Sequence, residues 1–320
     1  MGYEPPMKRR LFVLAAAALG LACGSSHPTS GFTDDTSGDA ASPLGTDDGG
    51  SADDGPVLGN GDGEPPPTSM SCPVETQYVY VVTADNSLYR FNPQALTFTL
   101  VGVLDCPDPT GATPFSMSVD RSGTAWVVFT DGALFKASTT TAACAATSYV
   151  SGQHGFVTFG MGFSANGVGS QVDTLFVTDS PYTTPPGNIL GLASIDTQTL
   201  KLTPVGMYNK LDARAEMTGT GSGQLWGAFE GSPYVIAQID KTNAAILSEA
   251  PQTSVNYAPD TSSLAFAFWG GDFWLFVGPG SYTDVFQYKP ATGVTTKVVT
   301  EQFEVVGAGV STCAPTQMPM

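Results

Sequence analysis

The chain has 320 residues, of which 42% are hydrophobic and 13% charged, enough apolar material for a large core. Its net charge of −17, from 29 acidic and 12 basic residues, argues against nucleic acid or anionic lipid headgroups as electrostatic partners. Gly (37) and Pro (24) stand mostly between short apolar runs, a pattern typical of an all-β protein with many turns. We expect the acidity to serve solubility outside the cell, and the protein to be a monomer.

The segment Met7–Cys23 has the pattern of an export signal. Three basic residues, Lys8 to Arg10, precede an apolar run from Leu11 to Ala22. That run is too short to span a bilayer and fits the hydrophobic region of a signal peptide. We therefore predict a signal peptide over residues 1–22, with Met7 as the true start.

The signal ends in Gly20-Leu21-Ala22-Cys23, which resembles the lipobox of bacterial lipoproteins. In that family signal peptidase II cleaves before the Cys, which then carries acyl chains such as palmitate. The resemblance implies lipidation of Cys23, although Gly20 occupies a position where Leu is commonest. Two or more acyl chains hold a protein stably on a membrane. Gly24, in place of the Asp that retains lipoproteins at the inner membrane, favours the outer membrane, facing the periplasm or the surface. The alternative is an ordinary secretory signal in which the Cys stands by chance.

Residues 23–71 are predicted to be the lipidated Cys followed by a disordered acidic linker. The linker from Gly24 to Ser71 has nine acidic residues, no Lys or Arg and almost no large apolar residues. Such a segment cannot offset the entropy cost of ordering. Calcium binding is the alternative, but no window has the spacing of a calcium loop.

From Cys72 onward an aromatic-centred strand recurs five times. The sequences are YVYVVTAD, TAWVVFTD, DTLFVTDS, QLWGAFEG and DFWLFVGP, and their central residues are Tyr80, Trp126, Phe176, Trp226 and Trp274. These centres are 46, 50, 50 and 48 residues apart, which is the size of a four-stranded propeller blade. The preceding strands, such as SMSV and GAGV, are rich in small residues, as a crowded hub requires.

The first repeat lacks a hub strand, and the last hub strand, Glu304–Thr312, has no blade after it. The two ends therefore complete one blade, because an open ring would leave unpaired strand edges. We predict a single five-bladed β-propeller over residues 72–315, with a short tail at 316–320. The phrase LYRFNP followed by LTFTLVG resembles NHL-type and YVTN-type bacterial propellers. It encodes a turn and two strands and no chemistry.

Apart from Cys23, the chain has four cysteines, an even number in an exported protein. Two disulfides are therefore expected, and the propeller selects their pairing. Cys72 and Cys313 lie where the chain ends meet in the closing blade. Cys106 and Cys144 would then join the outer edges of the first two blades. The absence of CxxC spacing disfavours zinc and thioredoxin chemistry.

No catalytic constellation, metal site or cofactor site is evident. His154 is the only histidine after the linker, which is too few for a histidine metal cluster or a well-supported Ser-His-Asp triad. The hub is the best place for a ligand. At the hub position where the other repeats have Ser, Gly or Ala, this repeat has Glu216. It could bind a ligand, and the structural alternative is that it pairs with Arg214. Asp120 is a second hub acid, although DRSG also reads as a turn.

Among aromatic residues outside the repeat pattern, Trp269 is the best candidate for contact with a ligand or partner. Four others are also off the pattern: Tyr182, Tyr208, Tyr257 and Tyr282. We interpret the chain as a non-catalytic envelope protein whose propeller binds a protein or a carbohydrate. The alternatives are a structural component of an envelope assembly and a hydrolase or lactonase-type enzyme in the axial channel. The enzyme would need Glu216, Asp120 and Asp179 or Asp212 to converge.

Overall fold

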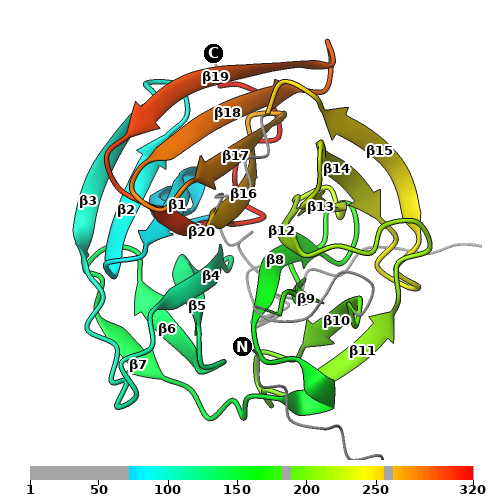
Figure 1. Ribbon diagram of the computed structural model, residues 1–320. Coiled ribbons are helices and arrows are strands. Elements are labelled where there is room, and N and C mark those ends of the chain that lie inside the picture. Colours follow the sequence, from blue (N-terminus) through cyan, green and yellow to red (C-terminus); the bar gives the residue numbers. More distant parts are fainter. Residues whose placement is uncertain (1–71, 182–188, 256–261, 320) are drawn as a thin grey trace, which may run out of the picture. The chain divides into compact units, whose positions relative to one another are not determined.

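The computed structural model describes residues 72–181, 189–255 and 262–319. Their strands form five four-stranded antiparallel sheets set around an axis as the blades of a propeller (Figure 1). The predicted all-β, five-bladed fold is thus confirmed. The predicted signal peptide, lipidated Cys23 and linker lie outside the described residues, as do Tyr182 and Tyr257. Among the described residues no helix is long and apolar enough to cross a bilayer.

Each blade runs from a hub strand outward. Blade 1 is β20 (Val305–Val310), β1 (Val79–Thr83), β2 (Ser87–Asn92) and β3 (Thr97–Val103). Blade 2 is β4 (Pro114–Val119), β5 (Thr124–Phe129), β6 (Leu134–Ser138) and β7 (Cys144–Ala146). Blade 3 is β8 (Phe159–Ala165), β9 (Asp173–Asp179), β10 (Leu192–Ile195) and β11 (Leu202–Gly206). Blade 4 is β12 (Ala215–Gly219), β13 (Leu225–Phe229), β14 (Tyr234–Ile239) and β15 (Ile246–Gln252). Blade 5 is β16 (Ser263–Trp269), β17 (Asp272–Gly278), β18 (Thr283–Lys289) and β19 (Val294–Glu301). Of two 3₁₀ turns, η1 (Val74–Gln77) precedes β1, and η2 (Gln153–Gly155) lies between β7 and β8.

The ring closes as expected, because β20 from the C-terminal end pairs with β1. Tyr80 lies opposite Gly309 and Val81 lies opposite Ala308 in this ladder. The disulfide Cys72–Cys313 joins the same two chain ends, and Cys106–Cys144 joins the outer regions of blades 1 and 2. Both predicted pairings are confirmed.

The hub strands pack backbone against backbone, which explains their small residues. A Cβ added to Gly160 would lie 2.1 Å from the carbonyl oxygen of Ala215 in the next blade. A Cβ on Gly307 would lie 2.8 Å from the amide nitrogen of Met117. Neither position has room for a side chain, so the ring can be this tight only with glycine there.

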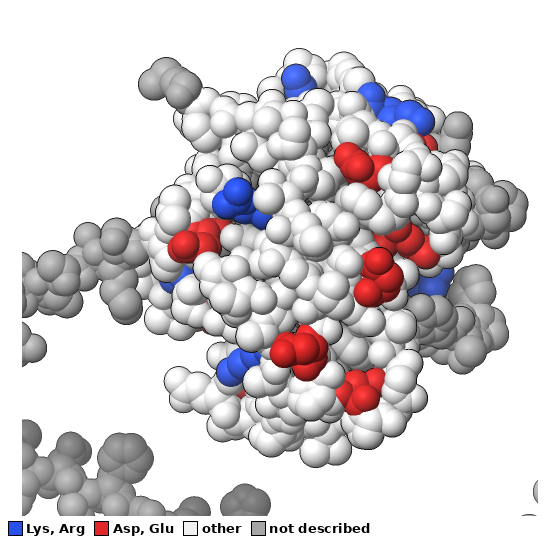
Figure 2. Space-filling view, turned by 90° about the vertical axis from the view of Figure 1, so that its left-hand side faces the viewer, with Lys and Arg blue, Asp and Glu red and all other residues white. Residues whose placement is uncertain are grey.

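The repeated aromatic side chains lie between blades, where they form the core. Tyr80, Trp126 and Trp274 are each 1% exposed. The ring of Trp274 meets Phe91 of the first blade edge-on at 5.4 Å between centroids. Burial of such large rings supplies most of the attraction between neighbouring blades. On the face shown in Figure 2, acidic and basic side chains are scattered among uncharged ones.

Candidate functional site

The hub has two mouths, because its five strands run in the same direction around the axis. Gly160 approaches Ala215 and Glu216, and Gly219 further along approaches Phe163 and Ser164, so β8 and β12 are parallel neighbours. The first residues of the hub strands therefore gather at one end, which we call the Glu216 mouth. Their last residues gather at the other end, which we call the Arg121 mouth.

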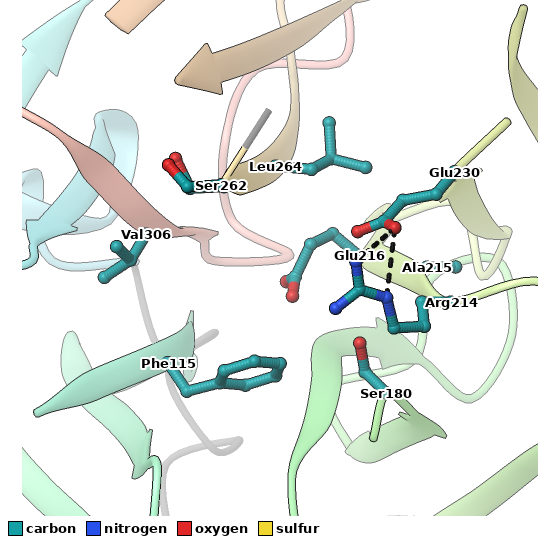
Figure 3. Close-up of a pocket in the computed structure, with 10 residues that line it drawn as sticks. Phe115, Ser180, Arg214, Ala215, Glu216, Glu230, Ser262, Leu264 and Val306 are labelled. Carbon is teal, nitrogen blue, oxygen red and sulfur yellow. Dashed lines mark hydrogen bonds and ion pairs between the residues drawn. The ribbon is translucent and has the colours of Figure 1, made fainter. Parts of the chain in front are cut away.

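A narrow pocket opens at the Glu216 mouth, and every blade contributes to it (Figure 3). Its lining consists of Phe115, Ser180, Arg214, Ala215, Glu216, Glu230, Ser262, Ser263, Leu264 and Val306. The space between these residues is about 410 Å³ including its open part, but the constricted interior has room for only about two water molecules. The pocket can hold a small polar group and is too narrow for a sugar ring.

Glu216 is the most deeply placed charged side chain of this pocket. It is the second residue of β12 and is 5% exposed. Its Oε2 accepts a hydrogen bond of 2.6 Å from Ser116 Oγ, which reaches across the hub from β4. Burial raises the pKa of Glu216 well above its ordinary value, and the nearby Glu230 raises it further, while Ser116 and Arg214 act in the opposite direction. The environment therefore favours the neutral carboxyl.

Arg214 pairs with Glu230 and not with Glu216, so the expected Arg214–Glu216 pairing is wrong. Its Nη2 lies 2.6 Å and its Nε 3.0 Å from Glu230 Oε2. Burial raises the pKa of Glu230, and the guanidinium lowers it. Sequence reasoning missed Glu230. The register of the β12–β13 hairpin was the available signal, because Ala215 opposite Phe229 places residue 230 beside residue 214.

Asp120 lies at the Arg121 mouth and holds a turn together. Its Oδ1 accepts the amides of Ser122 and Thr124 at 2.9 and 3.0 Å, and its Oδ2 accepts the indole N–H of Trp126 at 3.0 Å. These bonds account for the DRSG sequence. Glu216 and Asp120 are thus at opposite ends of the hub.

Trp269 ends β16 at the Arg121 mouth and is 4% exposed. Its indole N–H donates to the carbonyl oxygen of Gln77 at 2.6 Å, and its own carbonyl accepts from Trp274 at 3.3 Å. These contacts give the ring a packing role between blade 5 and the closing blade. The structure therefore brings Glu216 and Arg214 together and leaves Asp120 and Trp269 away from them.

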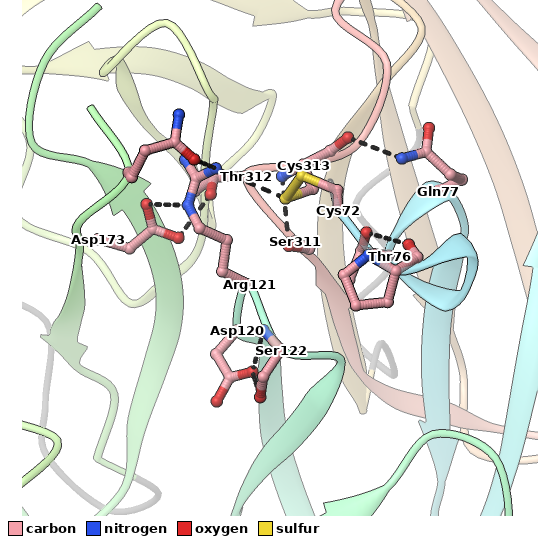
Figure 4. Close-up of a disulfide and its surroundings, with 12 residues drawn as sticks. Cys72, Thr76, Gln77, Asp120, Arg121, Ser122, Asp173, Ser311, Thr312 and Cys313 are labelled. Carbon is pink, nitrogen blue, oxygen red and sulfur yellow. Dashed lines mark hydrogen bonds and ion pairs between the residues drawn. A yellow bond between two sulfur atoms is a disulfide. The ribbon is translucent and has the colours of Figure 1, made fainter. Parts of the chain in front are cut away.

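Arg121 extends toward Asp173 and Cys313 at its mouth (Figure 4). Its Nε lies 3.1 Å from Asp173 Oδ1, and its Nη2 donates to the carbonyl of Ser170 at 3.0 Å. Nη1 reaches the sulfur of Cys313 at 3.5 Å, and Thr312 Oγ1 donates to Asp173 at 2.5 Å. Blades 2 and 3 are linked here to the closing disulfide, so this mouth is built for ring stability.

The remaining candidates are separate. Asp179 is 4% exposed and accepts the amide of Leu190, while Asp212 is exposed in a loop. His154 lies in η2 and has a left-handed φ of 51°. Within residues 72–181, 189–255 and 262–319, no three His, Cys, Asp or Glu side chains gather as a metal ion would need.

Comparison with known proteins gives distant structural matches. No protein-family model matches the chain, and no curated protein does. A structural genomics protein of unknown function from Bacteroides thetaiotaomicron is 7% identical, with a TM-score of 0.44 over 74% of this chain and 64% of its own. TolB from Acinetobacter baumannii is 14% identical, with a TM-score of 0.41 over 72% and 55%. A chain of a mitotic checkpoint complex is 13% identical, with a TM-score of 0.34 over 71% and 61%. The present chain thus spans 55% to 64% of the length of these three.

Proposed function

We propose that this chain is a cell-envelope lipoprotein, held to the outer membrane through Cys23, whose propeller is a non-catalytic binding module for a protein or glycan. The observation that carries the anchoring is Met7–Cys23, an export signal that ends in a Cys after a small residue. The acidic linker, which its composition predicts to be a flexible chain, would then act as a spacer of about 35–40 Å.

Binding of a protein partner is supported by the pocket at the Glu216 mouth, which is lined from all five blades; it is too narrow for a sugar ring, so a glycan would bind elsewhere on the propeller. Loops and strand ends held by a rigid scaffold are common sites of recognition. A hydrolase in the axial channel has weaker support, because Glu216 and Asp120 lie at opposite mouths and Asp212 is exposed in a loop.

The anchor is tested by labelling cells with palmitate. The wild-type chain should incorporate the label and sediment with outer membranes, and an inhibitor of signal peptidase II should block its processing. Cys23→Ser should abolish the label, while Gly24→Asp, the matched control, should keep the label and move the protein to the inner membrane. A wild-type chain that takes up no label overturns the anchoring.

The binding module is tested by cross-linking on intact cells and by glycan arrays, alongside assays with esters and lactones. Retention of a protein or glycan by the wild-type chain, without turnover, is the expected result. Turnover that disappears in Glu216→Gln would contradict the non-catalytic assignment, and absence of any retained partner would contradict binding.

A further inference from the structure

The pocket at the Glu216 mouth has polar atoms that can accept further hydrogen bonds. Among the described residues, Glu216 Oε1 and Glu230 Oε1 accept no hydrogen bond. Ser263 is 9% exposed, and its buried hydroxyl has no hydrogen-bond partner within the described part of the chain. The cation in the lining is Arg214, whose Nε and Nη2 are both committed to Glu230. Because Arg214 is paired with Glu230, a charged Glu216 would have no ion-pair partner in the pocket.

The walls of the pocket are apolar where they approach the mouth. Phe115, Leu264 and Val306 come from three different blades and surround the Glu216 carboxyl (Figure 3). With interior room for about two water molecules, the pocket fits a group as slender as a methylene carrying one polar atom.

We propose that this pocket binds a primary ammonium group on an alkyl chain, presented by a lysine side chain of the protein partner. This inference rests on the proposed binding function. Glu216 Oε1 is the main acceptor for the ammonium, with Glu230 Oε1 and Ser263 Oγ as flanking acceptors. The methylene chain packs on Phe115 and Leu264.

Lysine fits better than the other small charged groups. Its ammonium is a compact point charge with three donors, whereas the planar guanidinium of arginine needs more room than an interior that holds about two water molecules. An anion would meet two carboxyl groups and only one guanidinium. A metal ion would lack the three acidic, His or Cys ligands, since no such group is present among the described residues.

Ammonium binding is coupled to a proton. Without the ammonium, Glu216 favours its neutral form, because its burial and the nearby Glu230 outweigh the opposite effects of the Ser116 hydroxyl and of Arg214, which is paired with Glu230. Glu304 also reaches the pocket edge through a hydrogen bond from Ser262. When the ammonium enters, the Glu216 O–H proton leaves to the buffer and the carboxylate pairs with the cation. Affinity should therefore rise with pH until the amine itself loses its proton.

The test uses titration calorimetry on the purified full-length protein, with N-acetyl-lysine methylamide as the probe. We expect saturable binding that tightens about tenfold per pH unit below the Glu216 pKa, with heat that depends on the ionisation enthalpy of the buffer. The Nε-acetylated probe, which lacks the charge, should not bind. Butylamine, a free amine, should bind more weakly than a lysine-containing peptide.

Three variants locate the site. Glu216→Gln should weaken probe binding about tenfold or more and remove its pH dependence, because the charged acceptor is gone. Ser263→Ala should weaken binding by a smaller factor. Glu249→Gln, on the exposed face of β15, is the matched control and should bind like the wild-type protein. Circular dichroism confirms that each variant is folded.

The outcomes separate this inference from the proposed function. Absence of probe binding, or binding that Glu216→Gln leaves unchanged, overturns the lysine pocket. Butylamine binding more tightly than the lysine peptide overturns a lysine source. Calcium that binds the pocket and excludes the probe overturns the ligand class. If a partner is still retained on cells in any of these cases, the binding function stands; if none is retained, both fail.

Discussion

Two glutamates in one pocket have different electrostatic roles because only one of them has a cation. Glu230 shares its Oε2 with two nitrogens of Arg214, and that ion pair offsets part of its burial cost. Glu216 has a hydroxyl donor instead, at 2.6 Å, and is 5% exposed. A carboxylate without a paired cation is costly in a low-dielectric interior, so the surroundings of Glu216 raise its pKa and favour its neutral form.

The raised pKa of Glu216 makes the free energy of unfolding depend on pH, and Glu216→Gln should remove that dependence. The pKa of Glu216 is raised above its ordinary value of 4.5, so the folded state binds a proton more tightly than the unfolded chain. The stabilisation is complete below pH 4.5 and is lost as the pH rises through the folded-state pKa. The slope in that window is about 1.4 kcal/mol per pH unit.

Urea unfolding of both proteins at pH 5, 7 and 9 measures this effect. Glu216→Gln should become more stable than the wild-type protein as the pH increases, because the amide cannot ionise. A difference that is constant between pH 5 and pH 9 would show that Glu216 has no shifted pKa.

Among the elements, two hub turns share a backbone hydrogen bond but differ in their first residue, which is Asp120 in one and Thr220 in the other. In DRSG the backbone N–H of Gly123 donates a hydrogen bond to the carbonyl oxygen of Asp120. In the turn at Thr220 the N–H of Gly223 donates in the same way to the carbonyl oxygen of Thr220. Asp120 also accepts the indole N–H of Trp126. The corresponding nitrogen of Trp226 is buried and has no partner among the described residues. An unsatisfied buried donor costs stability.

Thr220→Asp should therefore stabilise the protein by about 1 kcal/mol, by supplying the carboxylate that Trp226 lacks. The turn offers that carboxylate the same backbone donors that Asp120 uses. Thr220→Val is the control and should be destabilising, because it removes the hydroxyl that accepts the amide of Gln224. Thermal unfolding compares the three proteins. A lower melting temperature for Thr220→Asp would mean that desolvation of the new carboxylate outweighs its hydrogen bonds.

Contact between hub strands should make Gly160 intolerant of any side chain. The added Cβ of Gly160→Ala would overlap the carbonyl of Ala215, and backbone cannot move aside without opening the ring. We expect a loss of about 1–3 kcal/mol or more. Gly167→Ala is the matched control, since its Cβ would have no atom within 4 Å, and it should change stability by less than about 0.5 kcal/mol. Equal unfolding midpoints for the two variants would refute close contact at the hub.

Local repetition made the elements predictable, and long-range contacts limited what could be said of the site. The strand pattern and its spacing depend on residues that are close together in the sequence, so the blade count, the ring closure and the disulfides could be inferred. Glu216 could be singled out because it breaks a repeat of small residues. Its lack of an arginine partner depends on Arg214 meeting Glu230 across a hairpin. The packing role of Trp269 depends on Gln77, 192 residues away.

At the scale of the whole molecule, stability rests on a closure made by strands that begin and end the ring. β20 pairs with β1 inside blade 1 and lies beside β4 and β16 at the hub, so its release would open that ladder and the contacts with blades 2 and 5. The Cys72–Cys313 disulfide restrains this event, because it ties the segment before β1 to the segment after β20.

Removing each disulfide in turn should show that the closing disulfide stabilises the protein more than the outer one does. The closing disulfide spans 241 residues and the outer one 38. Loop entropy in the unfolded chain then gives about 5.5 kcal/mol for the first and about 4 kcal/mol for the second. The two double variants are Cys72→Ser with Cys313→Ser, and Cys106→Ser with Cys144→Ser. In denaturant unfolding, the variant without the closing disulfide should have the lower unfolding midpoint.

Hydrogen exchange distinguishes closure from a general loss of stability. Without the closing pair, amides of β20 and β1 should exchange faster than those of blades 3 and 4, because local opening starts at the seam. Without the outer pair, the acceleration should centre on β3 and β7. A uniform acceleration in both variants would contradict a seam, and would mean that the five blades open together whichever disulfide is lost.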